Sequence, residues 1–316
     1  MENLKFRDDG TFTIVQFTDL HWQNGVPEDL QTHALIKSIL REEAPDLVIF
    51  TGDVIQGEFC KDPVASYSNA ISVMEEYPIP WAAVFGNHDA EKDCTKEELI
   101  AVQQASGPYC LTENGPSLGD DRLGNFVLEI HSSQTADQTA AALYLLDSGS
   151  NLQHPIGGYE RITHSQIGWY KEQSKRLAEA HNGRPLPALA FFHIPVPEFK
   201  EVWANHTCYG HKYEDVCCSK LNSGMFAAFA ENRDVHGIFV GHDHVNDFQG
   251  ELHGIKLCYG RASGYNTYGK DGFARGARVI QLTEGESGFR TWLRLEDGSV
   301  IADQPEHSLE QEWQRI

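Results

Sequence analysis

The sequence predicts an α/β fold built on parallel β-α-β units, and three observations lead to this prediction. Short runs of β-branched and aromatic residues recur along the chain and end at glycine, aspartate or histidine, as buried strands do. Segments with apolar residues at helical spacing separate the first of these runs. Polar residues follow directly after several runs, and strands of open α/β sheets present such residues at their carboxyl ends. We therefore expect these residues to meet in one crevice.

Five apolar runs are predicted strands that precede polar residues. They cover Thr13–Phe17, Leu47–Phe50, Trp81–Phe85, Ala188–Phe192 and Ile238–Val240. Further strand-like runs cover Ala141–Leu146, Ile255–Tyr259 and Phe289–Leu295. The run at 141–146 leads into Asp147, Ser148 and Gly149, which fit either the functional crevice or a turn outside it.

Helical signals lie between the predicted strands. One apolar helical face, between the first two strands, consists of Leu35, Ile36, Ile39 and Leu40. Thr95–Glu98 and Thr163–Gln166 both fit a capping box, in which the threonine and the residue three positions later satisfy exposed backbone donors. A further helix is expected at Leu221–Asn232. The order strand, helix, strand, helix, strand through Val84 predicts parallel pairing.

Length and composition predict one domain over residues 1–316. No Gly/Ser-rich or Pro-rich linker and no repeat divides the 316 residues, and a polar C-terminal tail begins at about residue 297. The formal net charge of −21 disfavours long nucleic acids, which need Lys and Arg to release counterions. The composition is that of a protein with a solvated acidic surface.

The cysteines and apolar runs indicate a cytoplasmic protein that does not bind a membrane. Seven cysteines without a C-x-x-C pair favour free thiols over a disulfide framework. The first eight residues lack the apolar core of a signal peptide, and no run is long enough to cross a bilayer. Oligomeric state cannot be read from these features.

Five segments after the strand-like runs contain side chains with the chemistry of metal ligands. They are Asp19–His21, Gly52–Asp53, Gly86–Asp89, His193 and Gly241–His244, and they supply enough such ligands for two ions. A site for two adjacent divalent ions needs about seven ligands of mixed imidazole, carboxylate and amide type. Asp53 is the natural bridge, because one shared carboxylate reduces the repulsion between the ions. The pattern therefore predicts a hydrolase with two metal ions.

The five segments follow one another in the order D-x-H, G-D, G-N-H-D, H and G-H-D-H. With this order, the chain resembles the calcineurin-like metallophosphoesterase superfamily, in its purple acid phosphatase-like branch. The resemblance extends from about Phe12 to Leu295. It implies a four-layer α/β/β/α sandwich of two stacked mixed sheets. True purple enzymes have a metal-binding tyrosine where this chain has Gln56, and they lack His21. We therefore expect a colourless enzyme.

The resemblance also implies roles for the seven ligands and their neighbours. Asp19, His21, Asp53 and His244 would hold one ion, and Asp53, Asn87, His193 and His242 the other. The ions, divalent or of mixed valence, could be Mn, Fe, Zn, Co or Ni. Water made acidic by them would attack phosphorus in line. His88 would protonate the leaving alkoxide or stabilise the charge of the transition state, and Asp89 would orient His88 or raise its basicity.

The expected activity is hydrolysis of a phosphomonoester, either a small molecule or a phosphoprotein. A phosphodiesterase acting on a cyclic nucleotide or a phospholipid headgroup is the nearest alternative, because the same metal core serves both reactions. A metal-binding regulatory module without turnover is a second alternative, although a binding module has no need of His88. A cation beside the ions would favour the dianionic monoester, and Arg161, Lys212 and Arg261 are candidates for it.

Residues 195–220 form the long segment most typical of an active-site lid. The candidate substrate contacts are Trp22, Asn24, Arg161, His211, Lys212 and Arg261, with Tyr265 and Tyr268 as further candidates. Structural roles are expected for the histidines His33, His131, His154, His181, His236 and His307. Cys217 and Cys218 lie within the predicted lid, where they would most simply be buried apolar residues.

Overall fold

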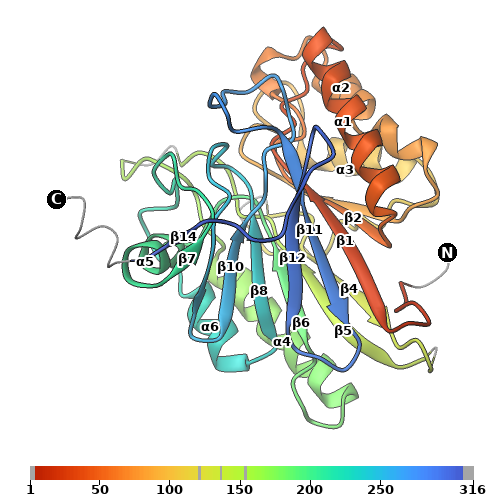
Figure 1. Cartoon of the computed structure of the whole chain (residues 1–316), viewed down its shortest axis with the longest axis vertical. Coiled ribbons are helices and arrows are strands. Elements are labelled where there is room, and N and C mark those ends of the chain that lie inside the picture. Colours follow the sequence, from red (N-terminus) through yellow and green to blue (C-terminus); the bar gives the residue numbers. More distant parts are fainter. Residues whose placement is uncertain (1–3, 120–121, 136, 153–154, 309–316) are drawn as a thin grey trace.

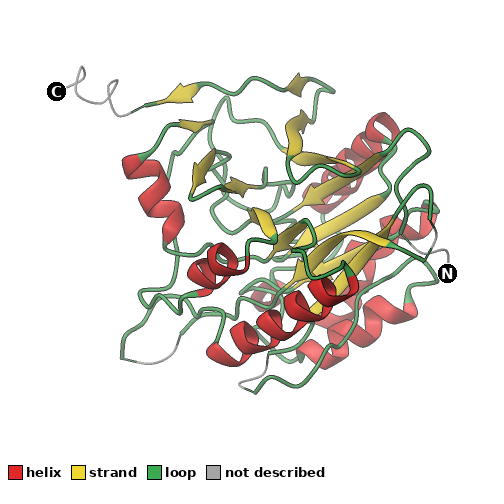
Figure 2. Ribbon diagram, turned by 90° about the horizontal axis from the view of Figure 1, so that it is seen from below, coloured by secondary structure: helices red, strands yellow, loops and turns green. Residues whose placement is uncertain are grey.

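Two stacked β-sheets with helices on their outer faces make up the computed structural model of the chain, which describes residues 4–119, 122–135, 137–152 and 155–308 (Figure 1). His154 and the end of the polar tail lie outside the described residues. Both sheets are mixed, and the strands lie between two sets of helices (Figure 2). The predicted α/β class and four-layer sandwich are confirmed.

The first sheet has six strands in the order β13-β12-β11-β1-β2-β3. Their bounds are β1 Thr11–Phe17, β2 Leu47–Thr51, β3 Trp81–Val84, β11 Gly276–Thr283, β12 Phe289–Leu295 and β13 Val300–Ile301. The strands β1, β2 and β3 are parallel, with Phe17 beside Phe50 and Thr51 beside Val84. Their carboxyl ends therefore share one edge of the sheet.

The second sheet has eight strands in the order β14-β7-β9-β10-β8-β6-β5-β4. Their bounds are β4 Phe126–His131, β5 Thr139–Leu145, β6 Ala188–Phe191, β7 Cys208–Tyr209, β8 Val235–Val240, β9 Gln249–Leu252, β10 Ile255–Tyr259 and β14 Glu306–His307. The strands β5, β6, β8 and β10 are parallel. Gln16 of β1 is fully buried and donates to the carbonyl of Val240 at the end of β8 over 3.1 Å. This bond joins the two sheets at the edge where the ligand strands end.

Within the described residues, six α-helices cover the outer faces. Their bounds are α1 Pro27–Glu43, α2 Pro63–Ile71, α3 Lys96–Ala105, α4 His164–Ala180, α5 Glu198–Asn205 and α6 Met225–Asn232, with two short 3₁₀-helices, η1 Gly57–Phe59 and η2 Ser72–Glu76. Both predicted capping boxes form: Thr95 begins α3 and Thr163 begins α4. The expected helix at 221–232 begins at Met225, after Gly224.

Three apolar clusters correspond to the three interfaces of the sandwich. Residues of both sheets, such as Ile49 of β2 and Phe239 of β8, pack together in the central cluster. The first sheet packs Phe17 and its neighbours against α1, including Ile36. The second sheet packs against α4 through Tyr170. Burial on both faces explains why the strands are continuous apolar runs rather than alternating ones.

Candidate metal centre

The predicted ligands follow five strands from both sheets. Asp19 follows β1, Asp53 follows β2 and Asn87 follows β3, whereas His193 follows β6 and His242 follows β8. All seven ligand side chains are in buried residues, so they form a polar centre beneath the surface. The prediction that the carboxyl ends of unrelated strands converge is confirmed for these residues.

Four of the ligands have left-handed backbone conformations, which non-glycine residues seldom adopt. The φ angles are 55° at Asp19, 47° at His21, 50° at Asp53 and 77° at His242. Such conformations cost on the order of 1–3 kcal/mol each and persist where the surroundings enforce them, often at functional sites. The chain therefore accepts local strain to direct these side chains inward.

A glycine beside the bridging ligand makes this arrangement possible. A Cβ on Gly86 would lie 2.1 Å from Asp53 Oδ1 and 2.4 Å from the Asp53 backbone nitrogen. Because the backbone cannot yield as a flexible side chain would, only glycine fits against Asp53 here. Asp53 Oδ1 accepts a hydrogen bond from the backbone of His88 over 2.8 Å, which leaves Oδ2 to face the other ligands.

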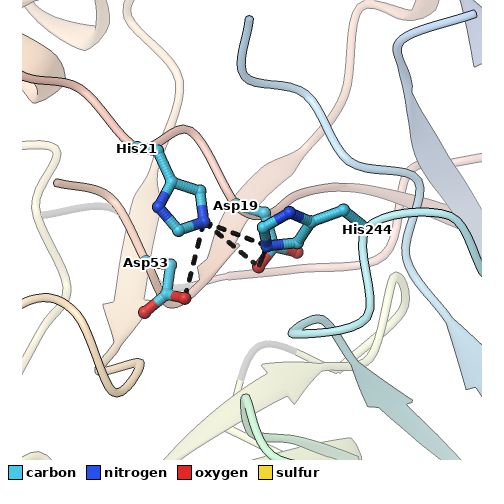
Figure 3. A group of neighbouring side chains, drawn as sticks. All are labelled: Asp19, His21, Asp53 and His244. Carbon is cyan, nitrogen blue, oxygen red and sulfur yellow. Dashed lines mark hydrogen bonds and ion pairs between the residues drawn. The ribbon is translucent and has the colours of Figure 1, made fainter. Parts of the chain in front are cut away.

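The carboxylate and imidazole ligands form two groups that share Asp53. One group is Asp19, His21, Asp53 and His244, and the other is Asp53, His193 and His242; within each group the ligand atoms lie within 4.8 Å of one another. Figure 3 shows the first group, with the side chains of His21, Asp19 and His244 directed toward one another. This division is the one that the resemblance implied, with Asp53 as the bridge.

The outer nitrogens of three ligand histidines are bound by other protein groups. His193 Nδ1 donates to the Thr51 carbonyl over 2.7 Å, His21 Nδ1 lies 2.5 Å from Gln56 Oε1, and His244 Nδ1 lies 2.5 Å from Thr267 Oγ1. Such outer bonds fix the ring and its tautomer, so that the other nitrogen can bind a metal. His193 Nε2 therefore carries a lone pair when the ring is neutral.

Ligand atoms that carry lone pairs face one another inside the centre. His21 Nε2 lies 3.0 Å from His244 Nε2, and His242 Nδ1 lies 3.3 Å from His193 Nε2. Burial lowers the pKa of His21 to about 4 and that of His242 to about 3, so these rings are neutral at pH 7. Imidazoles and carboxylates that converge in this way are suited to holding a cation between them.

The residues present fit a pair of metal ions. Asn87 Oδ1 is buried and accepts no hydrogen bond from the described residues, and Asp53 Oδ2 has only His193 Nε2 within 3.0 Å. Burial opposes protonation of His193, but the Asp53 charge outweighs it and raises the pKa of His193 to about 10. Either a proton on His193 or a metal ion would therefore hold Asp53 and His193 together. Mixed His, Asp and Asn ligation suits first-row transition metals.

His88 is half-buried beside the centre and is held by two side chains that the sequence analysis did not assign. Its Nδ1 lies 2.7 Å from Glu91 Oε1 and 2.8 Å from Gln56 Nε2. Burial lowers the pKa of His88, but the Glu91 hydrogen bond and the Asp53 charge together raise it above its ordinary value. Gln56 also contacts His21, so one amide lies between a metal ligand and the predicted acid.

Asp89 does not contact His88, which corrects its predicted role. Its carboxylate accepts backbone hydrogen bonds from Asp53, Ile55 and Gly86 over 3.0, 3.1 and 2.7 Å. Its side chain is turned into the protein, toward the loops after β2 and β3, where it has no access to His88. Burial and repulsion by Asp53 raise the pKa of Asp89 to about 7. Asp89 therefore joins two ligand loops, and Glu91 is the carboxylate that orients His88.

Two of the predicted substrate contacts hold the loop after His21. Trp22 is 3% exposed and belongs to the apolar cluster under α1, with its ring centre 4.3 Å from that of His33. Asn24 is exposed, and its side chain bonds the backbone of Phe59 and Lys61 over 3.0 and 2.8 Å. Both residues thus have structural partners.

The predicted cations differ in what binds them. Arg261 is buried in an ion pair with Asp247 and donates to the Ala274 carbonyl over 2.7 Å. Lys212 Nζ lies 3.6 Å from Asp215 Oδ1, at the surface. Arg161 is half-buried and has no ion pair among the described residues. Of the three predicted cations, Arg161 is therefore the one without a carboxylate partner among the described residues.

The predicted lid, residues 195–220, is partly regular structure rather than one long loop. Its first half contains α5 and β7, and Phe199 and Val202 of α5 are fully buried. Its second half runs beside the loop that carries His242 and His244. There the backbone nitrogen of Tyr213 donates to the Val245 carbonyl, and the backbone nitrogen of Cys217 donates to the Asp243 carboxylate. The ring of His211 stacks on that of Tyr213 with 5.2 Å between ring centres.

All seven cysteines, including Cys217 and Cys218, are free thiols.

The loop that begins at Asp147 contacts three ligand loops. Ser148 Oγ accepts from the backbone of Ile194, and Ser150 Oγ donates to the Asn87 carbonyl. The Tyr159 ring meets the ligand His242 edge to face, with 4.3 Å between ring centres. The turn therefore packs against the loops that carry Asn87 and His193. Nothing in the local sequence marks Tyr159, because its partner is 83 positions away.

Comparison with known proteins identifies the family. Residues 12–246 match the family model described as calcineurin-like phosphoesterase, and the chain belongs to this family. It is 37% identical to the probable inactive purple acid phosphatase 29 of Arabidopsis thaliana over 339 residues, covering 95% of this chain and 87% of that protein. The resemblance to the purple acid phosphatase-like branch is thereby confirmed.

Two further similarities concern proteins described as phosphatases. The chain is 30% identical to phosphatase DCR2 of Saccharomyces cerevisiae over 324 residues, covering 93% of this chain and 55% of that protein. A dimetal phosphatase from Danio rerio has a similar structure, with a TM-score of 0.56 at 14% identity over 89% of this chain and 98% of that one. At this identity the structural likeness supports the fold alone.

No helix within the described residues has both the length and the apolar character needed to span a membrane.

Proposed function

We propose that this chain is a phosphomonoesterase with two metal ions. The observation that carries the proposal is the convergence of buried carboxylate and imidazole ligands into two groups that share Asp53, with His88 beside them. Two divalent ions held there would supply an activated water and neutralise charge on the phosphoryl oxygens. Mn, Fe, Zn, Co and Ni remain candidates for the ions.

The protein residues have separable tasks in the proposed reaction. His88 would give a proton to the leaving alkoxide oxygen, and general acid catalysis of this kind contributes about 10²- to 10⁴-fold. Glu91 would hold the His88 ring, because its carboxylate lies 2.7 Å from Nδ1 and thus directs Nε2 away from itself. Asn87 Oδ1 and the imidazoles would orient the ions.

In this proposal Arg161 would be the cation that favours a monoester over a diester. A monoester carries one more negative charge than a diester, so a cation without a carboxylate partner favours it. Arg261 is unsuited to this task, because Asp247 and the Ala274 carbonyl already bind its guanidinium. If Arg161 does not act on the substrate, the phosphodiesterase alternative gains support.

A non-catalytic metal-binding module is the alternative suggested by the name of the Arabidopsis relative. Against this alternative, the chain retains all seven predicted ligands and a His88 whose Nδ1 lies 2.7 Å from the carboxylate of Glu91. The partners proposed here are small-molecule or protein phosphate esters. We also propose a cytoplasmic location, which the seven free thiols favour.

The test is hydrolysis of a chromogenic phosphomonoester and its diester analogue by metal-stripped protein to which single metals are restored. We expect metal-dependent monoester hydrolysis that is lost in Asp53→Asn, and a larger loss for the monoester than for the diester in Arg161→Ala. Preference for the diester, unchanged in Arg161→Ala, would support the phosphodiesterase. Two bound ions without turnover of either ester would support the binding module.

A further inference from the structure

An exposed tyrosine lies against a ligand of the metal centre. Tyr268 is 54% exposed, yet its ring stacks on that of His244 with 4.2 Å between centres and 28° between planes. Among the described residues, His244 is the one aromatic ring in contact with Tyr268. One face of the tyrosine therefore covers His244, and more than half of the residue's surface is exposed to solvent.

Two hydrogen bonds of Tyr268, and one of its partner Glu214, fix the tyrosine in place. Its hydroxyl donates to Glu214 Oε2 over 2.6 Å, and Glu214 Oε1 accepts from the backbone of Val245, the residue after His244, over 2.8 Å. The Tyr268 carbonyl accepts from the buried Arg275 guanidinium over 2.9 Å. An exposed aromatic ring that is already immobile loses little conformational entropy when a ligand packs on it, which is the property of a binding platform.

The platform lies close to the place where the proposed substrate would bind. An imidazole nitrogen holds a metal at about 2 Å, and Tyr268 stacks on that same imidazole. A ligand bound to the ions could therefore extend a planar group over the exposed part of Tyr268. The phosphate would occupy the ions, and the ring would select what is attached to it.

We propose that Tyr268 is a specificity-determining residue that stacks on a planar aromatic ring in the leaving group of the substrate. This inference rests on the proposed function, because it takes the ions as the binding site of the phosphoryl group. The ring could be attached directly to the ester oxygen, as in an aryl phosphate, or more distantly, as in a nucleoside phosphate. Both sources share the chemistry that Tyr268 would recognise.

The test measures binding of phosphonates that cannot be hydrolysed to the metal-loaded protein. One arm compares phenylphosphonate with methylphosphonate, and the other compares the phosphonate analogues of adenosine 5′-monophosphate and ribose 5-phosphate. In at least one arm the aromatic compound should bind more tightly to the unmodified protein. Tyr268→Ala should weaken binding of that compound about twofold to tenfold, the range that corresponds to aromatic pair energies, and leave binding of its non-aromatic partner unchanged.

Two variants serve as controls. Tyr268→Phe keeps the ring and should retain most of the preference, although it loses the bond to Glu214. Tyr209→Ala removes another exposed tyrosine, 42% exposed on β7, and should change no binding constant. The metal content of each variant is measured in parallel, because a loss of ions would explain a weaker affinity for every phosphonate.

Two results would overturn the inference. Equal binding of aromatic and non-aromatic compounds in both arms would show that Tyr268 selects nothing. An equal loss for both compounds in Tyr268→Ala would show that the ring merely supports His244. Selective phosphonate binding without hydrolysis of phenyl phosphate or adenosine 5′-monophosphate would instead remove the proposed function and leave the aromatic platform in place.

Discussion

Replacing Glu91 by glutamine tests which carboxylate orients His88. The change keeps a hydrogen-bonding group 2.7 Å from His88 Nδ1 but removes the negative charge. Both side chains are shielded, with 16% of Glu91 and 29% of His88 exposed. A hydrogen bond to a charged group contributes about 1.5–3 kcal/mol and a neutral one about 1 kcal/mol. The difference, on the order of 1 kcal/mol, corresponds to roughly a fivefold fall in kcat.

The matched comparison is Asp89→Asn, which alters the neighbouring carboxylate. Asp89 accepts three backbone hydrogen bonds from the loops of Asp53 and Gly86, so an amide there would present donors to donors. We expect Asp89→Asn to lower Tm and metal content, whereas Glu91→Gln should preserve both.

The assay combines kcat and KM for a chromogenic monoester with metal analysis and thermal unfolding. Glu91→Gln should lower kcat with little change in KM, and His88→Ala should lower kcat about 10²- to 10⁴-fold. The reasoning is refuted if Asp89→Asn retains its metals and its Tm but loses kcat, because that is the behaviour of a residue that acts on His88.

Three further predictions concern the surroundings of the centre. Gly86→Ala places a Cβ against the Asp53 backbone, so chelator competition should show at least about tenfold weaker metal binding. An unchanged affinity for metal would contradict the close approach of Gly86 to Asp53. Arg275→Ala removes the donor to the Thr267 and Tyr268 carbonyls, and the Thr267 side chain contacts His244. Metal titration should therefore show binding of the ion at Asp19 weakened about 10- to 100-fold, and binding of the ion at His193 unchanged. Asp247→Asn breaks the buried pair with Arg261 and should cost about 3–5 kcal/mol in urea unfolding at pH 7. Burial opposes ionisation of Asp247, but His211 and Arg261 lower the pKa of its carboxyl below the ordinary 3.8. The stability contributed by the ionised carboxylate is therefore present above about pH 4 and is lost as pH falls further. If the stability of Asp247→Asn falls with acid in the same way as that of the unmodified protein, this linkage is disproved.

The convergence of the predicted Asp and His ligands could be predicted from the sequence, because these residues lie shortly after strands of recognisable pattern. β1, β2 and β3 each end shortly before a ligand, and their parallel order followed from the alternation with helices. The position of β11 between β12 and β1 was not predictable, because antiparallel pairing of Val279 with Val15 joins the two ends of the chain. No local pattern encodes such pairing.

The residues around the ligands were harder to predict, because their roles depend on direction rather than on proximity in sequence. Asp89 is next to His88, but its carboxylate points to the backbone of the ligand loops, and Glu91, three positions after His88, reaches the ring instead. Trp22 is next to His21, yet it packs under α1. The helix α5 could have been found from Glu198 and Glu201 in its first turn and from the buried spacing of Phe199 and Val202.

The most direct test of the metal centre is anomalous X-ray diffraction from crystals grown with Mn²⁺. We predict two anomalous peaks per chain, roughly 3.5–4 Å apart, with Asp53 Oδ2 between them, His21 and His244 beside one peak, and Asn87 and His193 beside the other. A single peak, or two peaks that do not share Asp53, would contradict the proposal of a binuclear centre.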